Sequence, residues 1–240
     1  MDSEYNNVKN IGRTYESYDS PTEKLMHQYY HRQEVKTVSK LLKKMNNKNF
    51  ETLVDLGSSH GFWYQNYRKM GFKKLIGIDI SPERVQQAKQ RGYDEVYSCN
   101  AYDLPFDNDS QNCVISNNVL VHVLQDSDKL KIFSEVKRVL RKNGIFIFSI
   151  ANASGYGFKT DTARKTSRMN TPLTIQNLLD SSGLIVEHVM PSFYTFPRVG
   201  AHPSLASFST KIVFPITDIL LRSRKNLSIV KVLYFGVRKI

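Results

Sequence analysis

Long apolar runs are absent from this 240-residue sequence, and no stretch approaches the roughly 18 consecutive apolar residues of a membrane-spanning helix. Cysteine is scarce as well, and Cys99 and Cys113 form neither a CxxC pair nor a disulfide framework. The opening residues, MDSEYNNVKN, have no basic-then-apolar pattern, so we expect no secretory signal. These absences together predict a cytoplasmic protein without structural disulfides.

Acidic residues are outnumbered by basic ones, with 22 Asp and Glu against 34 Lys and Arg, which gives a net charge of +12. Such an imbalance favours anionic partners, namely nucleic acid, phosphorylated metabolites or a membrane surface. A lysine-rich, solvated surface explains it equally well. Because the basic residues form short, separated clusters and no single long run, charge alone does not choose between these interpretations.

Helical and strand patterns alternate along the chain, without internal repeats or a Pro/Gly/Ser-rich linker, which predicts an α/β sheet. Apolar spacing predicts helices at 21–46, 62–71, 81–92, 126–142 and 171–183. Apolar runs predict strands at 52–57, 74–80, 95–100, 112–118, 145–152, 184–190 and 231–240. Ser81 and Pro82 suit the start of a helix, while Gly71 and the pair Asn143-Gly144 suit helix ends. The segment after 151 is expected to be a polar, basic loop.

The stretch TLVDLGSSHGFWYQ, residues 52–65, places a glycine-containing turn directly after a predicted buried strand. A dinucleotide-binding G-x-G-x-x-G pattern starting at Gly57 would need glycines where the chain has Ser59 and Phe62. A P-loop would need Gly-Lys-Ser/Thr, which is absent from this turn. Both nucleotide-loop interpretations therefore fail.

Residues 55–61, Asp-Leu-Gly-Ser-Ser-His-Gly, instead resemble the first motif of class I S-adenosylmethionine-dependent methyltransferases, acid-x-Gly-x-Gly-x-Gly, in a type 11-like domain. Ser59 stands where the middle glycine usually lies. The resemblance covers about 50–153 closely, and it implies a Rossmann-like, doubly wound, mostly parallel seven-stranded sheet with helices on both faces. It also implies S-adenosyl-L-methionine as cofactor, with Asp55 facing the methionine ammonium group through a charge-assisted hydrogen bond.

Further matches follow in the family's order. Asp79 ends a predicted strand 24 positions after Asp55 (79 − 55), where an acid can accept from both ribose hydroxyls, although it could also cap the next helix. In SCNAYDLPF, Asn100 replaces the family's acid and can accept from the adenine amino group, while the Ala101 N–H is expected to meet the ring. The full set of cofactor-binding residues that the resemblance implies is Asp55, Gly57, Ser58, Ser59, Gly61, Asp79, Ile80, Asn100, Ala101 and Asn117.

A hydroxyl or amine acceptor can require a base, and the resemblance makes His202 the first candidate and His122 the second. His27 and His31 lie one helical turn apart, but without an evident third ligand we expect packing there and no metal site. Paired tyrosines at 15 and 18 suit either a lid over the cofactor or ordinary packing.

The acceptor is left open between three alternatives. Residues 208–231 combine apolar and basic side chains and resemble the same region of methyltransferases that act on glycans, quinones or other lipid-associated metabolites. This segment is expected either to touch a membrane or to cover the sheet. A small-molecule or lipid- or glycan-linked acceptor, methylated at oxygen, is the first alternative. An RNA (tRNA) methyltransferase is suggested by charge and by Lys159, Arg164, Lys165 and Arg168, but an N-P-P-Y-like motif is absent. A catalytically silent binding subunit is suggested by the departures Ser59, Asn100 and Val121.

The resemblance also divides the chain. Residues 1–48 are expected to form an N-terminal helical cap or lid, and 49–153 the S-adenosylmethionine-binding core. Residues 154–240 are expected to form the C-terminal part of the same fold, with an insertion on the acceptor side.

Overall fold

The computed structural model describes residues 21–154, 160–163, 167–194 and 230–240. Its elements in chain order are α1 (Pro21–Lys44), β1 (Thr52–Leu56), α2 (Tyr64–Met70), β2 (Lys74–Asp79), α3 (Pro82–Arg91), β3 (Glu95–Ser98), β4 (Gln111–Ser116), the 3-10 helix η3 (Leu120–His122), α4 (Asp126–Val139), β5 (Leu140–Ala151), β6 (Thr162–Ala163), β7 (Arg168–Met169), α5 (Pro172–Ser182), β8 (Ile185–Tyr194) and β9 (Val230–Arg238).

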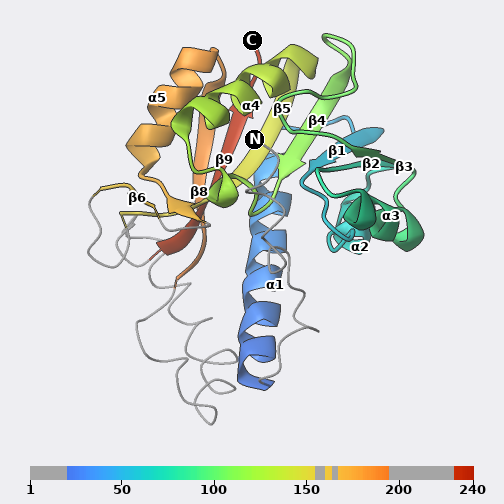
Figure 1. Cartoon of the computed structure of the whole chain (residues 1–240), viewed down its shortest axis with the longest axis horizontal. Helices are drawn as coiled ribbons and strands as arrows, with labels where there is room; N and C mark the ends of the chain where they lie inside the picture. The colour runs from blue at the N-terminus through green and yellow to red at the C-terminus, as the bar shows by residue number, and fades with distance from the viewer. Residues whose placement is uncertain (1–20, 155–159, 164–166, 195–229) are drawn as a thin grey trace.

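Seven of the strands form one twisted sheet in the order β3-β2-β1-β4-β5-β9-β8 (Figure 1). The first five strands of that order pair in parallel, whereas β9 runs antiparallel to both β5 and β8. Strand order reverses direction between β1 and β4, which defines the switch point where ligands bind in open α/β sheets. The predicted doubly wound, mostly parallel seven-stranded fold is confirmed.

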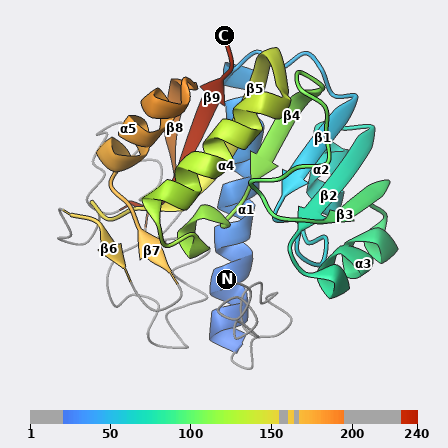
Figure 2. The same cartoon turned by 45° about the horizontal axis from the view of Figure 1, so that its top comes forward.

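Each face of the sheet has its own apolar core because successive strand residues point to opposite sides. Val54 of β1 and Phe146 of β5 belong to the core beneath α4 and α5. Their neighbours Leu53 and Ile147 belong to the core beneath α1, α2 and α3. Figure 2 shows α4 in front of the sheet and α1 behind it, so the strands are buried on both faces, as their near-continuous apolar sequence predicts.

Helix ends follow the local sequence. The Ser81 hydroxyl accepts from the Arg84 N–H and Pro82 occupies the first turn of α3, as predicted. Gly71 ends α2 with φ 106°, also as predicted. The predicted end of the helix at 126–142 is wrong, since α4 stops at Val139. Asn143, with φ 64°, belongs instead to an irregular start of β5, where its N–H donates to the Lys239 carbonyl.

The segment after 151, predicted as a loop, holds a two-stranded hairpin in which Thr162 pairs with Met169 and Ala163 with Arg168. Two-residue strands are too short to leave an alternating pattern in the sequence. Within the ranges that the structure describes, no helix is long and apolar enough to cross a membrane.

Helix α1 extends from the core to the carboxyl edge of the parallel strands. Its C-terminal half supplies Val38, Leu41 and Leu42 to the core, and Met45 follows directly after the helix. Its N-terminal half runs past the carboxyl ends of the parallel strands (Figure 1), where Met26 and Tyr29 pack with Val232 near the start of β9.

Candidate cofactor site

The turn after β1 is locked onto the end of β2. The N–H groups of Gly57 and Ser58 both donate to the Ile78 carbonyl, at 2.7 and 2.8 Å. Gly57, Ser59 and Gly61 have φ of 84°, 49° and 81°, so the backbone is left-handed at alternate positions. A Cβ on Gly57 would overlap the Cγ2 of Val119, which packs over the turn from the exit of β4. Glycine therefore suits positions 57 and 61, because the backbone is left-handed at both and Val119 leaves no room for a side chain at position 57.

Ser59 holds the middle left-handed position that glycine occupies in the family motif. A non-glycine residue there costs about 1–2 kcal/mol. Two contacts fix its conformation: its N–H donates to Asp79 Oδ2 at 2.9 Å, and its hydroxyl lies 3.1 Å from His60 Nδ1. The serine departure is thus accommodated by the same turn.

Asp79 joins this turn to the start of α3. Its second oxygen, Oδ1, accepts from the Ser81 N–H at 3.0 Å. Each carboxylate oxygen keeps a further lone pair, so the group is fixed by the backbone and still able to accept two ribose hydroxyls. The alternative role as cap of α3 belongs to Ser81, whose hydroxyl accepts from the helix itself.

Asp55 turns into the protein. Its side chain is 2% exposed, and its two oxygens accept from the hydroxyls of Tyr67 at 3.1 Å and Tyr93 at 2.5 Å. Burial raises the pKa of the Asp55 carboxyl to about 7, although both tyrosine hydrogen bonds oppose that rise. Its contact with a methionine ammonium group stays a prediction.

The exit of β4 continues this polar network. The Asn117 side-chain N–H donates to the Tyr67 hydroxyl at 2.6 Å, and its carbonyl accepts from the Tyr234 hydroxyl at 3.0 Å. Asn118, left-handed with φ 58°, donates through Nδ2 to Glu34 Oε1 at 3.0 Å. Its backbone N–H donates to the Ser149 hydroxyl at 2.8 Å. Side chains from α1, α2, β5 and β9 therefore converge on the two asparagines after β4.

Helix α1 covers both sides of the switch point. Glu34 is 8% exposed, and burial raises the pKa of its carboxyl to about 7. One turn earlier, His31 packs against Phe62 and Trp63, with ring centroids 4.3 and 4.9 Å apart. Burial lowers the pKa of His31 to about 4, so its ring is neutral at physiological pH, and its Nε2 lies 3.0 Å from Asn66 Nδ2. The expectation of packing at this histidine is confirmed.

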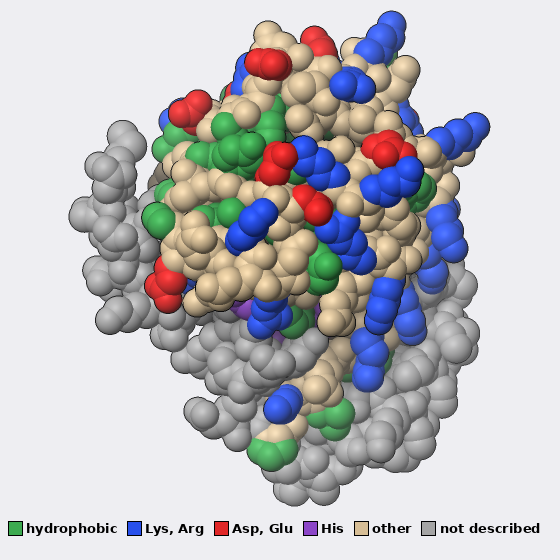
Figure 3. All heavy atoms as spheres, turned by 90° about the vertical axis from the view of Figure 1, so that its right-hand side faces the viewer, with side chains coloured by type: hydrophobic (Ala, Val, Ile, Leu, Met, Phe, Trp, Pro, Cys, Tyr) green, Lys and Arg blue, Asp and Glu red, His purple; other side chains and the backbone are tan. Residues whose placement is uncertain are grey.

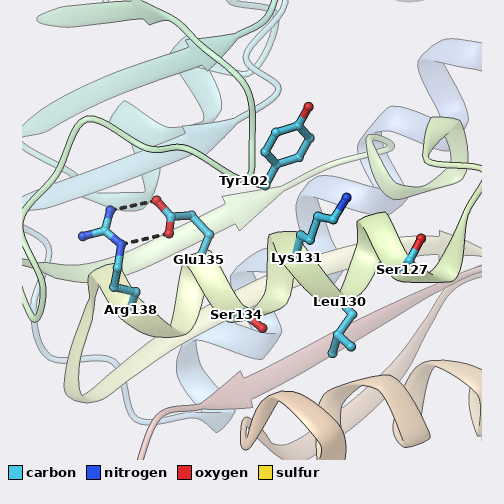
Figure 4. A pocket seen from close by; sticks show the side chains of 7 residues that line it. All are labelled: Tyr102, Ser127, Leu130, Lys131, Ser134, Glu135 and Arg138. Carbon is cyan, nitrogen blue, oxygen red and sulfur yellow. Dashed lines mark hydrogen bonds and ion pairs between the residues drawn. The ribbon is translucent and has the colours of Figure 1, made fainter. Parts of the chain in front are cut away.

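The segment expected beside adenine is held against α4 by a clamp that Glu135 and Arg138 form. The Leu104 N–H donates to Glu135 at 2.8 Å, and Arg138 donates to the carbonyls of Phe106 at 2.8 Å and Leu104 at 3.1 Å. Glu135 and Arg138 also pair through two hydrogen bonds of 2.8 and 2.7 Å, which is a bidentate arrangement. Figure 4 shows these side chains beside a groove on the outer face of α4, which Tyr102 and Lys131 also line.

Upstream of the clamp, Asn100 and Ala101 follow β3 at the carboxyl edge. The Asn100 carbonyl accepts from the Asp103 N–H at 3.0 Å, and Ala101 packs against the core. Ile80, directly after Asp79, is 50% exposed despite its apolar side chain. An exposed isoleucine beside a carboxylate suits the apolar face of a nucleoside.

Some predicted residues lie elsewhere. His202, Tyr15, Tyr18 and 208–229 fall outside the described residues. His122 lies in η3, half-buried, with its N–H donating to the Val119 carbonyl at 2.8 Å. Among the basic residues considered for RNA, Arg168 forms ion pairs with Asp126 and Asp161 at 2.9 and 3.4 Å, and the other three lie outside the described ranges.

Sequence reasoning missed Glu34, Tyr67, Tyr93 and Tyr234. A faint indication existed for Glu34, because it stands in line with Tyr30, Val38 and Leu41 on the apolar face of the predicted helix. The three tyrosines gave no such indication, because a tyrosine among apolar residues looks the same in a sequence whether its hydroxyl is hydrogen-bonded in the interior or exposed.

The residues present fit a nucleoside with a cationic tail. Asp79 offers ribose acceptors above β2, and Glu34 adds a carboxyl at the β1/β4 switch point. Ser58, in the turn itself, is 4% exposed and its hydroxyl has no hydrogen-bond partner among the described residues. This hydroxyl lies against β2, since a Cβ on Gly77 would come within 2.9 Å of it.

Comparison with known proteins agrees with this geometry. Residues 54–148 match the family described as methyltransferase domain. This part of the chain is a methyltransferase domain. Such a domain implies S-adenosylmethionine as its cofactor, so the sequence-based predictions of family and cofactor are confirmed.

Two curated relatives are uncharacterised proteins of Methanocaldococcus jannaschii. One is 39% identical over 77 residues, which make up 32% of this chain and 30% of that protein. The other is 26% identical over 163 residues, 68% of this chain and 67% of that protein. The chain thus spans under a third of the first relative's length.

Similar solved structures share the fold at low identity. A Mesorhizobium loti S-adenosylmethionine-dependent methyltransferase has a TM-score of 0.59 at 21% identity, covering 83% of this chain and 95% of its own. A putative sarcosine dimethylglycine methyltransferase from Galdieria sulphuraria has a TM-score of 0.61 at 14% identity, covering 92% and 91%. At these identities the likeness concerns the fold alone.

Proposed function

We propose that this protein transfers a methyl group from S-adenosylmethionine to an oxygen atom of a small-molecule or a lipid- or glycan-linked acceptor. The observation that carries the proposal is the turn after β1, whose left-handed residues are hydrogen-bonded to both the Ile78 carbonyl and Asp79 at the switch point. The cofactor, when bound, supplies an activated methyl group on a sulfonium. The protein's part is to orient the nucleoside and to exclude water.

The cofactor-binding residues of this proposal are divided by position. Asp79 and Ile80 hold the ribose, while Asn100 and Ala101 meet the adenine ring. Gly57, Ser58, Ser59 and Gly61 form the turn beneath the methionine end, and Asp55 and Asn117 support it from below. His202 and then His122 are proposed as the base that receives the acceptor proton. We also propose the division into a cap at 1–48, a core at 49–153 and a C-terminal part at 154–240.

An RNA acceptor has less support. Figure 3 shows Lys and Arg side chains scattered over one face, with acidic side chains between them. Arg168 is occupied by two carboxylates and so is not available to a phosphate. Binding to bulk tRNA that weakens steeply with salt would favour the RNA acceptor instead. Binding of the wild type to lipid vesicles would support the proposed membrane contact through 208–231.

The decisive test is calorimetric titration of the purified protein with S-adenosylmethionine and S-adenosylhomocysteine. We expect binding to the wild type and at least roughly tenfold weaker binding to Asp79→Ala, because two charge-assisted hydrogen bonds are lost. Asp180→Ala, a change of the same kind on the exposed face of α5, is the control and should bind as the wild type does. Absence of binding to the wild type would refute the proposal and favour a silent binding subunit.

A further inference from the structure

Glu34 lies on α1 next to the exit of β4, where its carboxyl accepts a hydrogen bond from Asn118. Strand order reverses between β1 and β4, and α1 reaches both sides of that point. His31 packs on Phe62 and Trp63, which follow the turn after β1. Glu34 lies three residues later on the same face of the helix and is hydrogen-bonded to Asn118, which follows β4.

The orientation of the ligand follows from Asp79. Because this acid ends β2, a ribose bound there directs the adenine toward β3 and the rest of the molecule toward β1 and β4. The methionine end, with its ammonium group, therefore lies at the switch point beneath α1. An ammonium group buried there requires a carboxylate partner.

Two buried carboxyl groups, Asp55 and Glu34, lie beside this switch point. Asp55 is 2% exposed, and each of its oxygens is already bonded to a tyrosine hydroxyl. Among the described residues, Glu34 is hydrogen-bonded to the neutral side-chain amide of Asn118, and no lysine or arginine there forms an ion pair with it. A buried carboxyl without a counter-charge is costly unless a ligand supplies one.

We propose that the Glu34 carboxylate binds the ammonium group of the cofactor's methionine moiety, aimed by Asn118. This inference rests on the proposed function, since it needs S-adenosylmethionine in the site. The Asn118 Nδ2 fixes Oε1 of Glu34 and leaves its other oxygen for the ligand. Asp55, bound to Tyr67 and Tyr93, then supports the turn and does not touch the ammonium group.

The test compares two ligands that differ at this end alone. S-adenosylhomocysteine carries the amino-acid tail, and 5′-methylthioadenosine is the corresponding nucleoside thioether without it. We expect Glu34→Gln to weaken calorimetric binding of S-adenosylhomocysteine roughly tenfold or more, and that of 5′-methylthioadenosine less than about twofold. Glu51→Gln, the same chemical change before β1, should alter neither.

Asn118→Gly gives an independent variant, because glycine tolerates the left-handed backbone at that position. It should weaken S-adenosylhomocysteine selectively, since Glu34 loses the amide that aims it. Thermal melting of each variant confirms that it is folded.

Equal weakening of both ligands by Glu34→Gln, or no weakening of either, would overturn the assignment while leaving the proposed function intact. A selective loss in Asp55→Asn and not in Glu34→Gln would transfer the ammonium group to Asp55 and also overturn it. Failure of the wild type to bind either ligand would refute the proposed function, and with it this inference.

Discussion

Glu34 and Asp55 are buried carboxyl groups in the same part of the molecule, and burial raises the pKa of each to about 7. In the unfolded chain such groups ionise near pH 4. Each therefore binds its proton more tightly in the folded protein than in the unfolded one. Both groups stabilise the fold less as the pH rises, which is the reverse of an ordinary salt-bridged acid.

This has a measurable consequence for Glu34. Below about pH 4.5, Glu34 is protonated in the folded and in the unfolded chain, so its titration does not change the free energy of unfolding there. Between pH 4.5 and 7 the wild type loses up to about 3 kcal/mol from this group, and above pH 7 the loss is complete. We expect Glu34→Gln, which cannot ionise, to raise the free energy of unfolding at pH 8 and to change it little at pH 4.

Urea unfolding without ligand at the two pH values measures the effect. Glu51→Gln is the control, because that side chain is exposed. If Glu34→Gln stabilised the protein equally at both pH values, folding would not raise the pKa of Glu34.

Gly57 is a second residue whose environment allows a sharp prediction. Alanine there would adopt a left-handed backbone and overlap Val119, so we expect a loss of about 3 kcal/mol in the free energy of unfolding. Gly71→Ala is the matched control, since its φ is 106° but its nearest neighbour atom, on Phe50, would be 3.8 Å away. It should cost about 1–2 kcal/mol.

The double variant Gly57→Ala with Val119→Ala separates the two causes by urea denaturation. Removal of the valine methyl groups should recover the part of the loss that comes from overlap. Equal losses in Gly57→Ala and Gly71→Ala would contradict the role of Val119.

At the scale of elements, α4 determines the position of the loop between β3 and β4. Arg138 donates to two carbonyls of that loop and pairs with Glu135. We expect Arg138→Met to lower the free energy of unfolding by about 2 kcal/mol. It should also weaken 5′-methylthioadenosine binding, because Asn100 and Ala101 lie in the same loop.

Arg141→Met serves as the control in both assays. The Arg141 side chain donates to the exposed Asp109 carbonyl at 3.2 Å and forms no ion pair within the described part of the chain. Its loss should cost less than about 0.5 kcal/mol. An Arg138→Met protein with unchanged ligand affinity would show that the clamp stabilises the fold without shaping the site.

Elements with local determinants were predictable from sequence. Ser81 and Pro82 begin α3 and Gly71 ends α2 because caps depend on neighbouring residues alone. The end of α4 was not predictable, since Leu140 leaves the helix to pair with Gln111 in a neighbouring strand. The Asn143 N–H is likewise satisfied by Lys239, almost a hundred positions away.

At the scale of the whole molecule, the motif predicted where the site lies but not how it is built. The turn and Asp79 followed from short-range spacing. The direction of the Asp55 side chain depends on Tyr93, which is 38 positions distant, and the Asn117 contact with Tyr234 spans 117 positions. Such partners are set by packing across elements, and a single sequence does not record them.

The place of β9 has a consequence for how the protein is made. This strand lies between β5 and β8 in the sheet, although it follows both in the sequence. A nascent chain on the ribosome can assemble β1 to β5 early, because those strands pair with one another. Until residues 230–238 have been translated, β5 and β8 each present the edge that β9 will cover, and open edges invite pairing with other chains. Shielding during synthesis is therefore needed most in the interval before the final strand emerges.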